Sequence, residues 1–149
     1  MSSKQIKLKV VTPEKLILEE LVDQVLVPTT EGELGILPIH IPLIAGLKSG
    51  DIVAISNGEE IPMAVVGGFV EVKNDEEGNT NVVILADFAV HVGEIDDKEI
   101  EKAKARAEEL KLQMENKDHV DFEHFESELE RSLTRIKVAD KWRTKKYRK

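Results

Sequence analysis

Apolar and polar residues alternate in short runs through the first part of the chain, with the two-residue period of half-buried β-strands. The stretch from Ile6 to Val11 begins this pattern. Further along, Asn57-Gly58 indicates a two-residue hairpin turn, because both turn positions favour positive φ. Gly67-Gly68 separates two apolar runs and indicates a bend or bulge between strand segments. Short strands at this spacing, with no helical pattern between them, predict a β-sandwich or barrel.

In the last third of the chain the apolar residues recur every three or four positions, the period of an amphipathic helix. Asp96 followed by Glu99 predicts the start of the first helix, with the Asp96 side chain accepting from free backbone N–H groups. Polar residues at 116–119 predict a turn before a second helix. The two predicted stripes are Ile100, Ala103, Ala107, Leu110 and Met114, and then Phe122, Phe125, Leu129, Leu133 and Ile136. Together they predict an antiparallel helical hairpin.

The distribution of glycine and proline places the boundary between these two regions. All 9 glycines and all 5 prolines lie at or before Gly93. Both residue types mark turns and are disfavoured inside helices, so their disappearance indicates a change from strand to helix. We therefore predict a β-domain at residues 1–93 and a regulatory helical hairpin with a basic tail at residues 94–149.

Charge is also distributed unevenly along the chain. The net charge of −8 is the sum of −8 over residues 1–93, −8 over residues 94–130 and +8 over residues 131–149. The two apolar stripes are narrow, so the hairpin buries little apolar surface by itself and should need a docking surface. Two alternatives remain open from composition: a hairpin that can detach and act as a switch, or a permanent cover of the sheet.

Several classes of function are excluded or disfavoured by composition. The chain has no cysteine, so thiolate chemistry and disulfides are excluded. An aromatic share of 4% and a net charge of −8 make a nucleic-acid partner improbable. No apolar run approaches the ~20 residues of a membrane span, and the first residues lack an apolar signal core, which predicts a cytoplasmic protein. The four histidines are scattered, and no phosphate loop, nucleophile elbow or metal motif is present, so we expect no catalytic residue, metal or cofactor.

The stretch from Glu31 to Leu43 is more specific. Pro38 and Pro42 favour extended backbone at the residues before them, while the two preceding glycines permit a tight turn. The result is a stiff loop that holds His40 between two prolines, with apolar residues on both sides. Such a loop is either a rigid connection within the core or a preformed contact surface.

This stretch resembles the Glu-Gly-x-x-Gly-Ile-Leu-Pro-x-His-x-Pro-Leu signature of the epsilon subunits of bacterial and chloroplast rotary ATP synthases. The resemblance extends from about Ile6 to Val138. Four further segments are similar to the family, namely Gly67 to Val72, Val83 to Asp87, Ala103 to Glu108 and Leu133 to Val138. The resemblance implies a ten-stranded β-sandwich followed by a two-helix hairpin.

The resemblance also implies a function without catalysis. Epsilon subunits lie on the central rotor stalk, bind the gamma subunit and the c-subunit ring, and couple proton-driven rotation to ATP synthesis. Their helices can extend to the alpha/beta catalytic head and inhibit hydrolysis, where the second helix meets an acidic segment of beta. The protein would then be peripheral, on the cytoplasmic face of the bacterial cell membrane, touching the membrane only through the complex and binding no nucleic acid.

Site residues follow from the same resemblance. The loop implied to face the c-ring contains Glu31, Gly32, Glu33, Leu34, Gly35 and His40. The part of the second helix expected to engage the head is basic and contains Arg131, Arg135, Lys137 and Lys141. Some family members bind a regulatory ATP with an Ile/Leu-Asp-x-x-Arg-Ala motif. Here Ile95 and Asp96 match, but Glu99 and Ile100 stand at the Arg and Ala positions.

The carboxylate of Glu99 replaces a guanidinium that would pair with phosphate, so we predict weak ATP binding or none. The segment 141–149 extends beyond the usual end of the family and has no role implied by the resemblance. Two functions from different classes are therefore weighed. The first is a rotor-stalk subunit with an inhibitory hairpin, and the alternative is a free-standing β-sandwich adaptor or small-ligand sensor.

Overall fold

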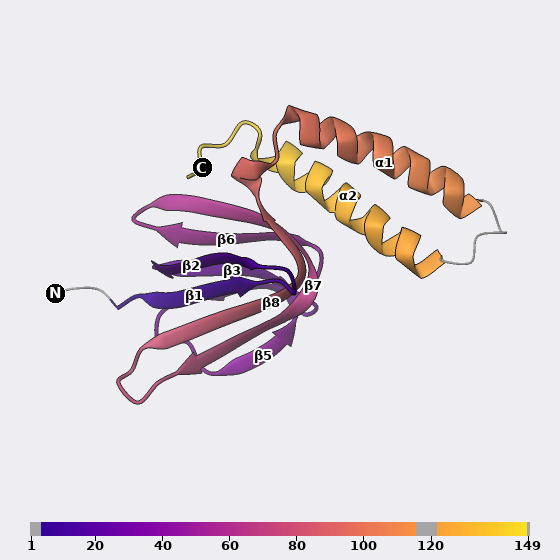
Figure 1. Cartoon of the computed structure of the whole chain (residues 1–149). Coiled ribbons are helices and arrows are strands. Elements are labelled where there is room, and N and C mark those ends of the chain that lie inside the picture. Colours follow the sequence, from indigo (N-terminus) through magenta and orange to yellow (C-terminus); the bar gives the residue numbers. More distant parts are fainter. Residues whose placement is uncertain (1–3, 116–121, 149) are drawn as a thin grey trace.

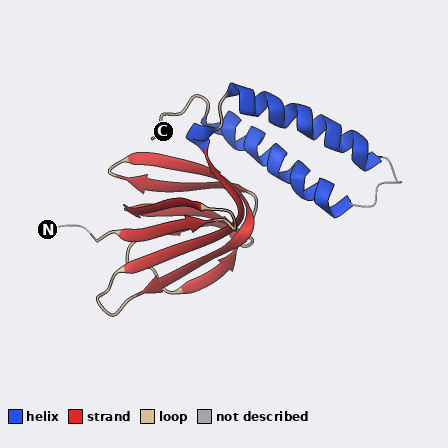
Figure 2. Ribbon diagram, viewed as in Figure 1, coloured by secondary structure: helices blue, strands red, loops and turns tan. Residues whose placement is uncertain are grey.

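A computed structural model describes residues 4–115 and 122–148 of the chain. The strands are β1 (Ile6–Val11), β2 (Leu16–Val22), β3 (Gln24–Thr29), β4 (Gly32–Ile36), β5 (Leu43–Gly46), β6 (Gly50–Ser56), β7 (Glu59–Asn74) and β8 (Thr80–His91). They are followed by a short 3-10 helix η1 (Val92–Glu94) and by the helices α1 (Asp97–Glu115) and α2 (Phe122–Trp142). The strands gather on one side of the molecule and the helices on the other (Figure 2). Neither of these described helices is long and apolar enough to cross a bilayer.

The described strands form one eight-stranded sheet rather than the ten strands implied by the family resemblance. Their order is β2-β1-β8-β7-β6-β3-β4, and β5 pairs with β7. The count differs because β7 and β8 are long and pair with each other along nearly their whole length. The first half of β7 pairs with β6 and its second half with β5, so each long strand serves both halves of the folded sheet (Figure 1). The prediction of a β-rich region followed by two helices is confirmed.

The bend expected at Gly67-Gly68 is the point where β7 passes from one half to the other. Before it, Met63 and Val65 point into the core, and after it Val70 and Val72 do so, so the inward positions change from odd to even. Both glycines have positive φ, at 65° and 109°. The bend thus keeps one continuous strand facing the same core on both sides.

The core between the two halves is aliphatic and contains residues from most of the strands. Ile6, Leu8, Val25, Ile36, Ile52, Ile61, Val72 and Ile84 are at most 1% exposed. The hairpin turn predicted at Asn57-Gly58 is also present, joining β6 to β7 with φ values of 52° and 78°. Because both residues adopt positive φ, the turn has the twist that a two-residue hairpin requires.

The helices pack as a hairpin in which α2 lies between α1 and the sheet (Figure 1). The backbone N–H of Glu99 donates to Asp96 Oδ1 over 2.8 Å, which confirms Asp96 as the cap of α1. Most of the first predicted stripe is buried, including Ile100 and Leu110. The turn predicted at 116–119 lies outside the described residues.

The second predicted stripe is partly wrong. Leu133 is 42% exposed, whereas the buried residues of α2 include Ser132, Val138 and Trp142. The side chain of Phe122 lies outside the described part of the chain. A single stripe cannot describe α2 because the helix contacts α1 on one side and the sheet on another. Small residues such as Ser132 are therefore buried where a larger side chain would not fit.

A second apolar cluster joins α2 to the outer face of the sheet. Val138 and Trp142 pack against Val53, Ala64 and Val92, with further contacts from half-buried neighbours. This cluster is much smaller than the sandwich core. The hairpin is therefore attached through a limited apolar contact, supplemented by polar contacts.

We predict that a chain ending at Gly93 folds without the hairpin. The first 93 residues contain every strand that the structure describes and the whole aliphatic core. Removing α2 exposes Val53 and Ala64, so we expect reduced solubility but a cooperative unfolding transition and a β-type circular dichroism spectrum. A random-coil spectrum at low temperature would show that the hairpin is part of the folding unit.

Candidate functional site

The loop between β4 and β5 exposes apolar side chains. Leu37, Ile39 and Ile41 are 55%, 61% and 73% exposed, so they do not fill the core. The loop is nevertheless held firmly. The N–H of Ile39 donates to Thr80 Oγ1 over 2.7 Å, and Asn74 Nδ2 donates to the carbonyl of His40 over 2.9 Å. These contacts favour a preformed contact surface over a core connection.

The backbone at the tip of this loop is strained. Ile39 has a φ of 68°, a region that β-branched residues rarely adopt. His40 Nδ1 lies 2.7 Å from the carbonyl oxygen of Ile41 and donates to it, which fixes the ring beside the tip. Strain of this kind persists only where surrounding contacts hold it, and it occurs often at binding sites. The tip is therefore a candidate contact point.

The structure does not bring all the predicted loop residues together. Glu31 and Gly32 lie at the β3–β4 turn, where Thr29 Oγ1 accepts from the N–H of Glu31 over 3.2 Å. His40 lies beyond the other end of β4. A five-residue strand spans about 16 Å, so the turn and the His40 loop are two separate surfaces. Glu31, Gly32, Glu33 and Gly35 are exposed, while Leu34 and His40 are half-buried.

A third surface was not predicted from the sequence. Ile44, Phe69 and Leu85 are 71%, 59% and 55% exposed. Phe69 pairs with Leu85 across β7 and β8, and Ile44 lies on the same outward face of β5. Together with Val11 they form what we name the β7–β8 apolar face, defined as Val11, Ile44, Phe69 and Leu85. A shallow hollow of about 330 Å³ opens there, lined by Val11, Phe69 and Leu85 among others.

The alternation of inward and outward side chains along β7 and β8 could have revealed this face from the sequence. In β8 the core positions are Val82, Ile84 and Ala86, so the large apolar Leu85 between them must point outward. In β7, Phe69 alternates in the same way with Val70 and Val72. Large apolar side chains on the outer face of a sheet are typical of a surface that another molecule covers.

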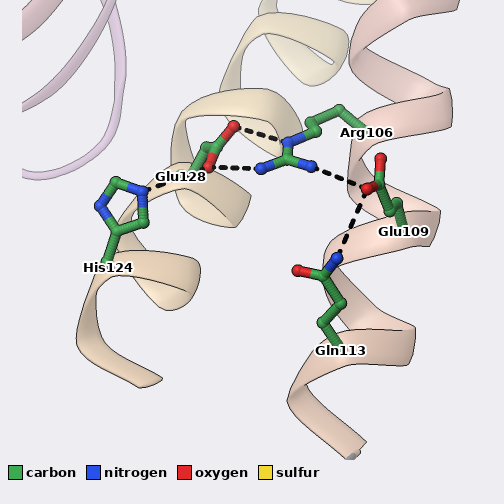
Figure 3. Close-up of polar contacts among 5 residues, drawn as sticks. All are labelled: Arg106, Glu109, Gln113, His124 and Glu128. Atoms are coloured by element: carbon green, nitrogen blue, oxygen red, sulfur yellow. Dashed lines mark hydrogen bonds and ion pairs between the residues drawn. The ribbon is translucent and has the colours of Figure 1, made fainter. Parts of the chain in front are cut away.

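Between the two helices lies a polar cleft of about 850 Å³. Across it, Arg106 of α1 forms a two-pronged contact with Glu128 of α2, at 2.6 Å from Nε and 3.0 Å from Nη2 (Figure 3). Glu109 contacts the same guanidinium at 3.1 Å, and His124 Nε2 lies 3.7 Å from Glu128. This cluster holds the middle of α1 against α2.

The electrostatics of the cluster agree with its geometry. The hydrogen bonds from Arg106 hold the pKa of Glu128 below its usual value, despite the opposing effect of partial desolvation. The contacts with Glu128 and Glu109 raise the pKa of Arg106 above its usual value. Both groups therefore stay charged at neutral pH and the contact persists.

The basic residues of α2 occupy different surroundings. The guanidinium carbons of Arg131 and Arg135 lie 5.5 and 4.6 Å from the ring centroid of Phe88 on β8. Lys137 is exposed, and Lys141 Nζ lies 2.8 Å from Asp51 Oδ2 on β6. Arg131 and Arg135 thus contribute to docking α2 on the sheet in this conformation, through cation–π contacts.

The positions that correspond to the family's ATP-binding motif lie at and just before the start of α1, and this chain differs from the motif at Glu99 and Ile100. Glu99 lines the cleft together with Arg106, Arg131 and Arg135, while Ile100 is buried in the hairpin stripe. Ile95 is half-buried against the second cluster, and Asp96 is used as the helix cap. The motif positions are therefore occupied by structural contacts, and Glu99 adds to the carboxylates of Glu123 and Glu128 in a cleft of mixed charge.

We predict that the purified chain binds ATP weakly or not at all. The Glu99 carboxylate repels phosphate at the mouth of the cleft. Glu99→Arg should strengthen binding measured by calorimetry, and adding Ile100→Ala should help further only if the loss of buried volume is tolerated. Micromolar ATP affinity of the unaltered chain would contradict this interpretation.

Within residues 4–115 and 122–148, no group of three or more His, Asp or Glu side chains is placed to hold a metal ion. The geometry instead offers surfaces: an exposed rigid loop, an acidic turn, an apolar sheet face and a docked hairpin. These features suit binding to other proteins.

Comparison with known proteins agrees with this view. Residues 5–92 match the family of the ATP synthase delta/epsilon chain β-sandwich domain, and residues 94–140 match its long α-helix domain. The ATP synthase epsilon chain of Syntrophobacter fumaroxidans is 41% identical over 140 residues, covering 93% of this chain and 98% of that relative. The epsilon chain of Halalkalibacterium halodurans is 44% identical over 131 residues, covering 87% of this chain and 93% of that relative.

Solved structures give the same result. A chain in the cryo-EM structure of the Euglena gracilis mitochondrial ATP synthase, OSCP/F1/c-ring in rotational state 1, superposes with a TM-score of 0.67 at 27% identity, covering 89% of this chain and 79% of that chain. A chain in the central stalk/c-ring structure of the Tetrahymena thermophila mitochondrial ATP synthase shares the fold, with a TM-score of 0.55 at 16% identity. The chain therefore belongs to the delta/epsilon chain family of ATP synthase and is an epsilon-type, non-catalytic member of it.

Proposed function

We propose that the chain is a rotor-stalk subunit that joins gamma to the c-ring, couples rotation to ATP synthesis and restrains ATP hydrolysis through its helices. The observation that carries this proposal is the match of both halves of the chain to the delta/epsilon chain domains. Residues 1–93 supply the binding surfaces and residues 94–149 the regulation. The protein lies at the cytoplasmic face of the bacterial cell membrane and meets the membrane only through the complex.

The β7–β8 apolar face is the surface that binds gamma. It exposes Ile44, Phe69 and Leu85 on the half of the sheet that α2 leaves uncovered. A rotor subunit needs attachment that withstands torque, and burial of large apolar side chains gives it. The hairpin can then move without disturbing this attachment.

The surfaces formed by Glu31–Gly35 and by the His40 loop face the ring. The rigidity of the His40 loop supports this role, because a preordered loop loses little entropy on binding. The two surfaces are separated along β4, so they contact the ring or its neighbours at different points.

The hairpin acts as the brake by leaving the sheet and engaging the catalytic head. In the described conformation Arg131 and Arg135 lie on Phe88, and these half-buried cation–π contacts are weak enough to be exchanged. An acidic segment of beta offers a competing site for the same guanidinium groups. Which site they occupy determines whether hydrolysis proceeds.

The double substitution Arg131→Glu with Arg135→Glu tests the brake in a reconstituted complex. We expect several-fold weaker inhibition of ATP hydrolysis, with assembly and synthesis retained. Lys98→Glu with Lys111→Glu, at two exposed positions of α1 outside this basic set, is the control of equal charge change. Phe88→Ala, which weakens docking but keeps both arginines, should instead increase inhibition.

If the double substitution weakens inhibition and Phe88→Ala strengthens it, the arginines inhibit through the catalytic head and not through their contact with the sheet. Raising the salt concentration should weaken inhibition in the same direction as the double substitution. Unchanged inhibition by the double variant at low salt would mean that the hairpin is a passive cover.

The alternative function is a free-standing adaptor or small-ligand sensor. The observation that favours it is the cleft of about 850 Å³, whose lining mixes arginines such as Arg131 and Arg135 with carboxylates such as Glu99 and Glu128 and so suits a polar ligand. A sensor would be recovered without ATP synthase subunits, so the composition of the purified complex separates the two functions.

A further inference from the structure

The C-terminal segment 141–148 packs against the sandwich although it lies outside the family match, which ends at residue 140. Trp142 is only 2% exposed and belongs to the cluster with Val53 and Ala64. Tyr147 packs edge-on against Trp142, with ring centroids 6.0 Å apart and an angle of 85° between the planes. The segment therefore continues beyond the end of α2 and comes down toward the edge of the sheet, as Figure 1 shows near the C-terminus.

Asp51 of β6 is the first polar anchor of this segment. One oxygen, Oδ2, accepts from Lys141 Nζ over 2.8 Å and from Trp142 Nε1 over 2.9 Å. Partial burial raises the pKa of Asp51, but the hydrogen bonds from Lys141 and Trp142 more than offset this and leave the pKa below its usual value. Asp51 is thus ionised at neutral pH and satisfies the indole N–H inside an apolar cluster.

Arg148, six residues after Trp142, provides the second anchor. Its Nη2 lies 2.7 Å from each carboxylate oxygen of Glu20 on β2. Its backbone N–H also donates to the carbonyl of Glu60 on β7 over 2.8 Å. The segment is therefore tied at both ends, to β6 at one end and to β2 and β7 at the other.

These contacts lie at the C-terminal end of α2, whereas Arg131 and Arg135 contact the sheet further toward the start of the helix. We infer that residues 141–148 form a strap that locks the helical hairpin onto the sandwich. Detachment of the hairpin then requires the strap to release Asp51 and Glu20. The strap acts within the isolated chain, so its test needs no partner.

Two probes can be placed in the full-length chain. Trp142 is the only tryptophan, so its emission and its quenching by acrylamide report directly on the strap. The chain has no cysteine, so Ser49→Cys with Glu130→Cys gives a unique pair at a contact between the sheet and α2. Because Glu130 is about three helical turns from Trp142, cross-linking of this pair by a short bis-thiol reagent reports on the hairpin as a whole.

The test variant is Arg148→Glu, with Lys146→Glu as a control of equal charge change at an exposed tail position. We expect Arg148→Glu to red-shift Trp142 emission, to increase quenching and to raise the open fraction of the hairpin by about fivefold, the effect of losing one partly exposed ion pair. Cross-linking of the cysteine pair should fall accordingly. Glu20→Arg combined with Arg148→Glu should restore both signals.

The following results would contradict the proposed strap. If Arg148→Glu exposes Trp142 but leaves cross-linking unchanged, the tail is a local cap and does not lock the hairpin. If Lys146→Glu has the same effect as Arg148→Glu, or the charge swap fails to restore the signals, the Glu20 anchor is wrong. Circular dichroism of each variant confirms that the sandwich has folded.

Discussion

Gly68→Ala should lower the free energy of unfolding by about 3 kcal/mol or more. A Cβ atom at this position would lie 1.9 Å from the carbonyl oxygen of Leu85 and 2.8 Å from the Cα of Ala86. Both are backbone atoms of the paired strand β8, which cannot move aside without breaking the sheet. The φ of 109° adds strain for any residue with a side chain.

Gly58→Ala is the matched control for this effect. Gly58 also has a positive φ, of 78°, but a Cβ there would meet nothing within 4 Å. Gly58→Ala should lower the free energy of unfolding only by the conformational penalty of about 1–2 kcal/mol. Urea unfolding of the two variants measures the difference. Equal destabilisation would mean that β7 and β8 are not in close contact at the bend.

Phe69→Glu with Leu85→Glu should lower the affinity for gamma by about 100-fold. Both side chains lie on the β7–β8 apolar face and are more than half exposed, so the substitutions should leave the sandwich folded. Charged groups in the centre of an apolar interface lose hydration without gaining a partner. The affinity can be measured by titrating purified gamma onto the immobilised chain.

Leu112→Glu is the control for this prediction, since Leu112 is 67% exposed but lies on α1, away from the face. It should leave gamma binding unchanged. Gamma affinity retained by the Phe69 and Leu85 variant would move the stalk attachment to another surface and leave the apolar face without a partner.

The sequence predicted those features that depend on local chemistry. Asn57-Gly58 forms the expected turn, Gly67-Gly68 the expected bend and Asp96 the expected helix cap. Each depends on the conformational preference of one or two residues, which neighbours along the chain can reveal. The stiffness of the loop around His40 was likewise indicated by its two prolines, whereas its exposure was left open.

Features that depend on long-range packing were not predicted. The count of ten strands came from the family resemblance, whereas the described residues form eight, of which β7 and β8 are long and pair along nearly their whole length. The buried face of α2 was misjudged because its buried residues point to different places: Ser132 lines the cleft between the helices, and Trp142 packs on the sheet. The Asp51 and Glu20 anchors join positions some 90 and 128 residues apart, a distance over which a single sequence carries no pairing signal.

The composition of the complex that a tag on this chain recovers from its native membranes tests the central claim most directly. If the chain is a rotor-stalk subunit, alpha, beta, gamma and c subunits should be recovered with it, with gamma in equal amount. Recovery of the chain alone, or with other proteins in their place, would contradict the account and favour a free-standing adaptor or sensor.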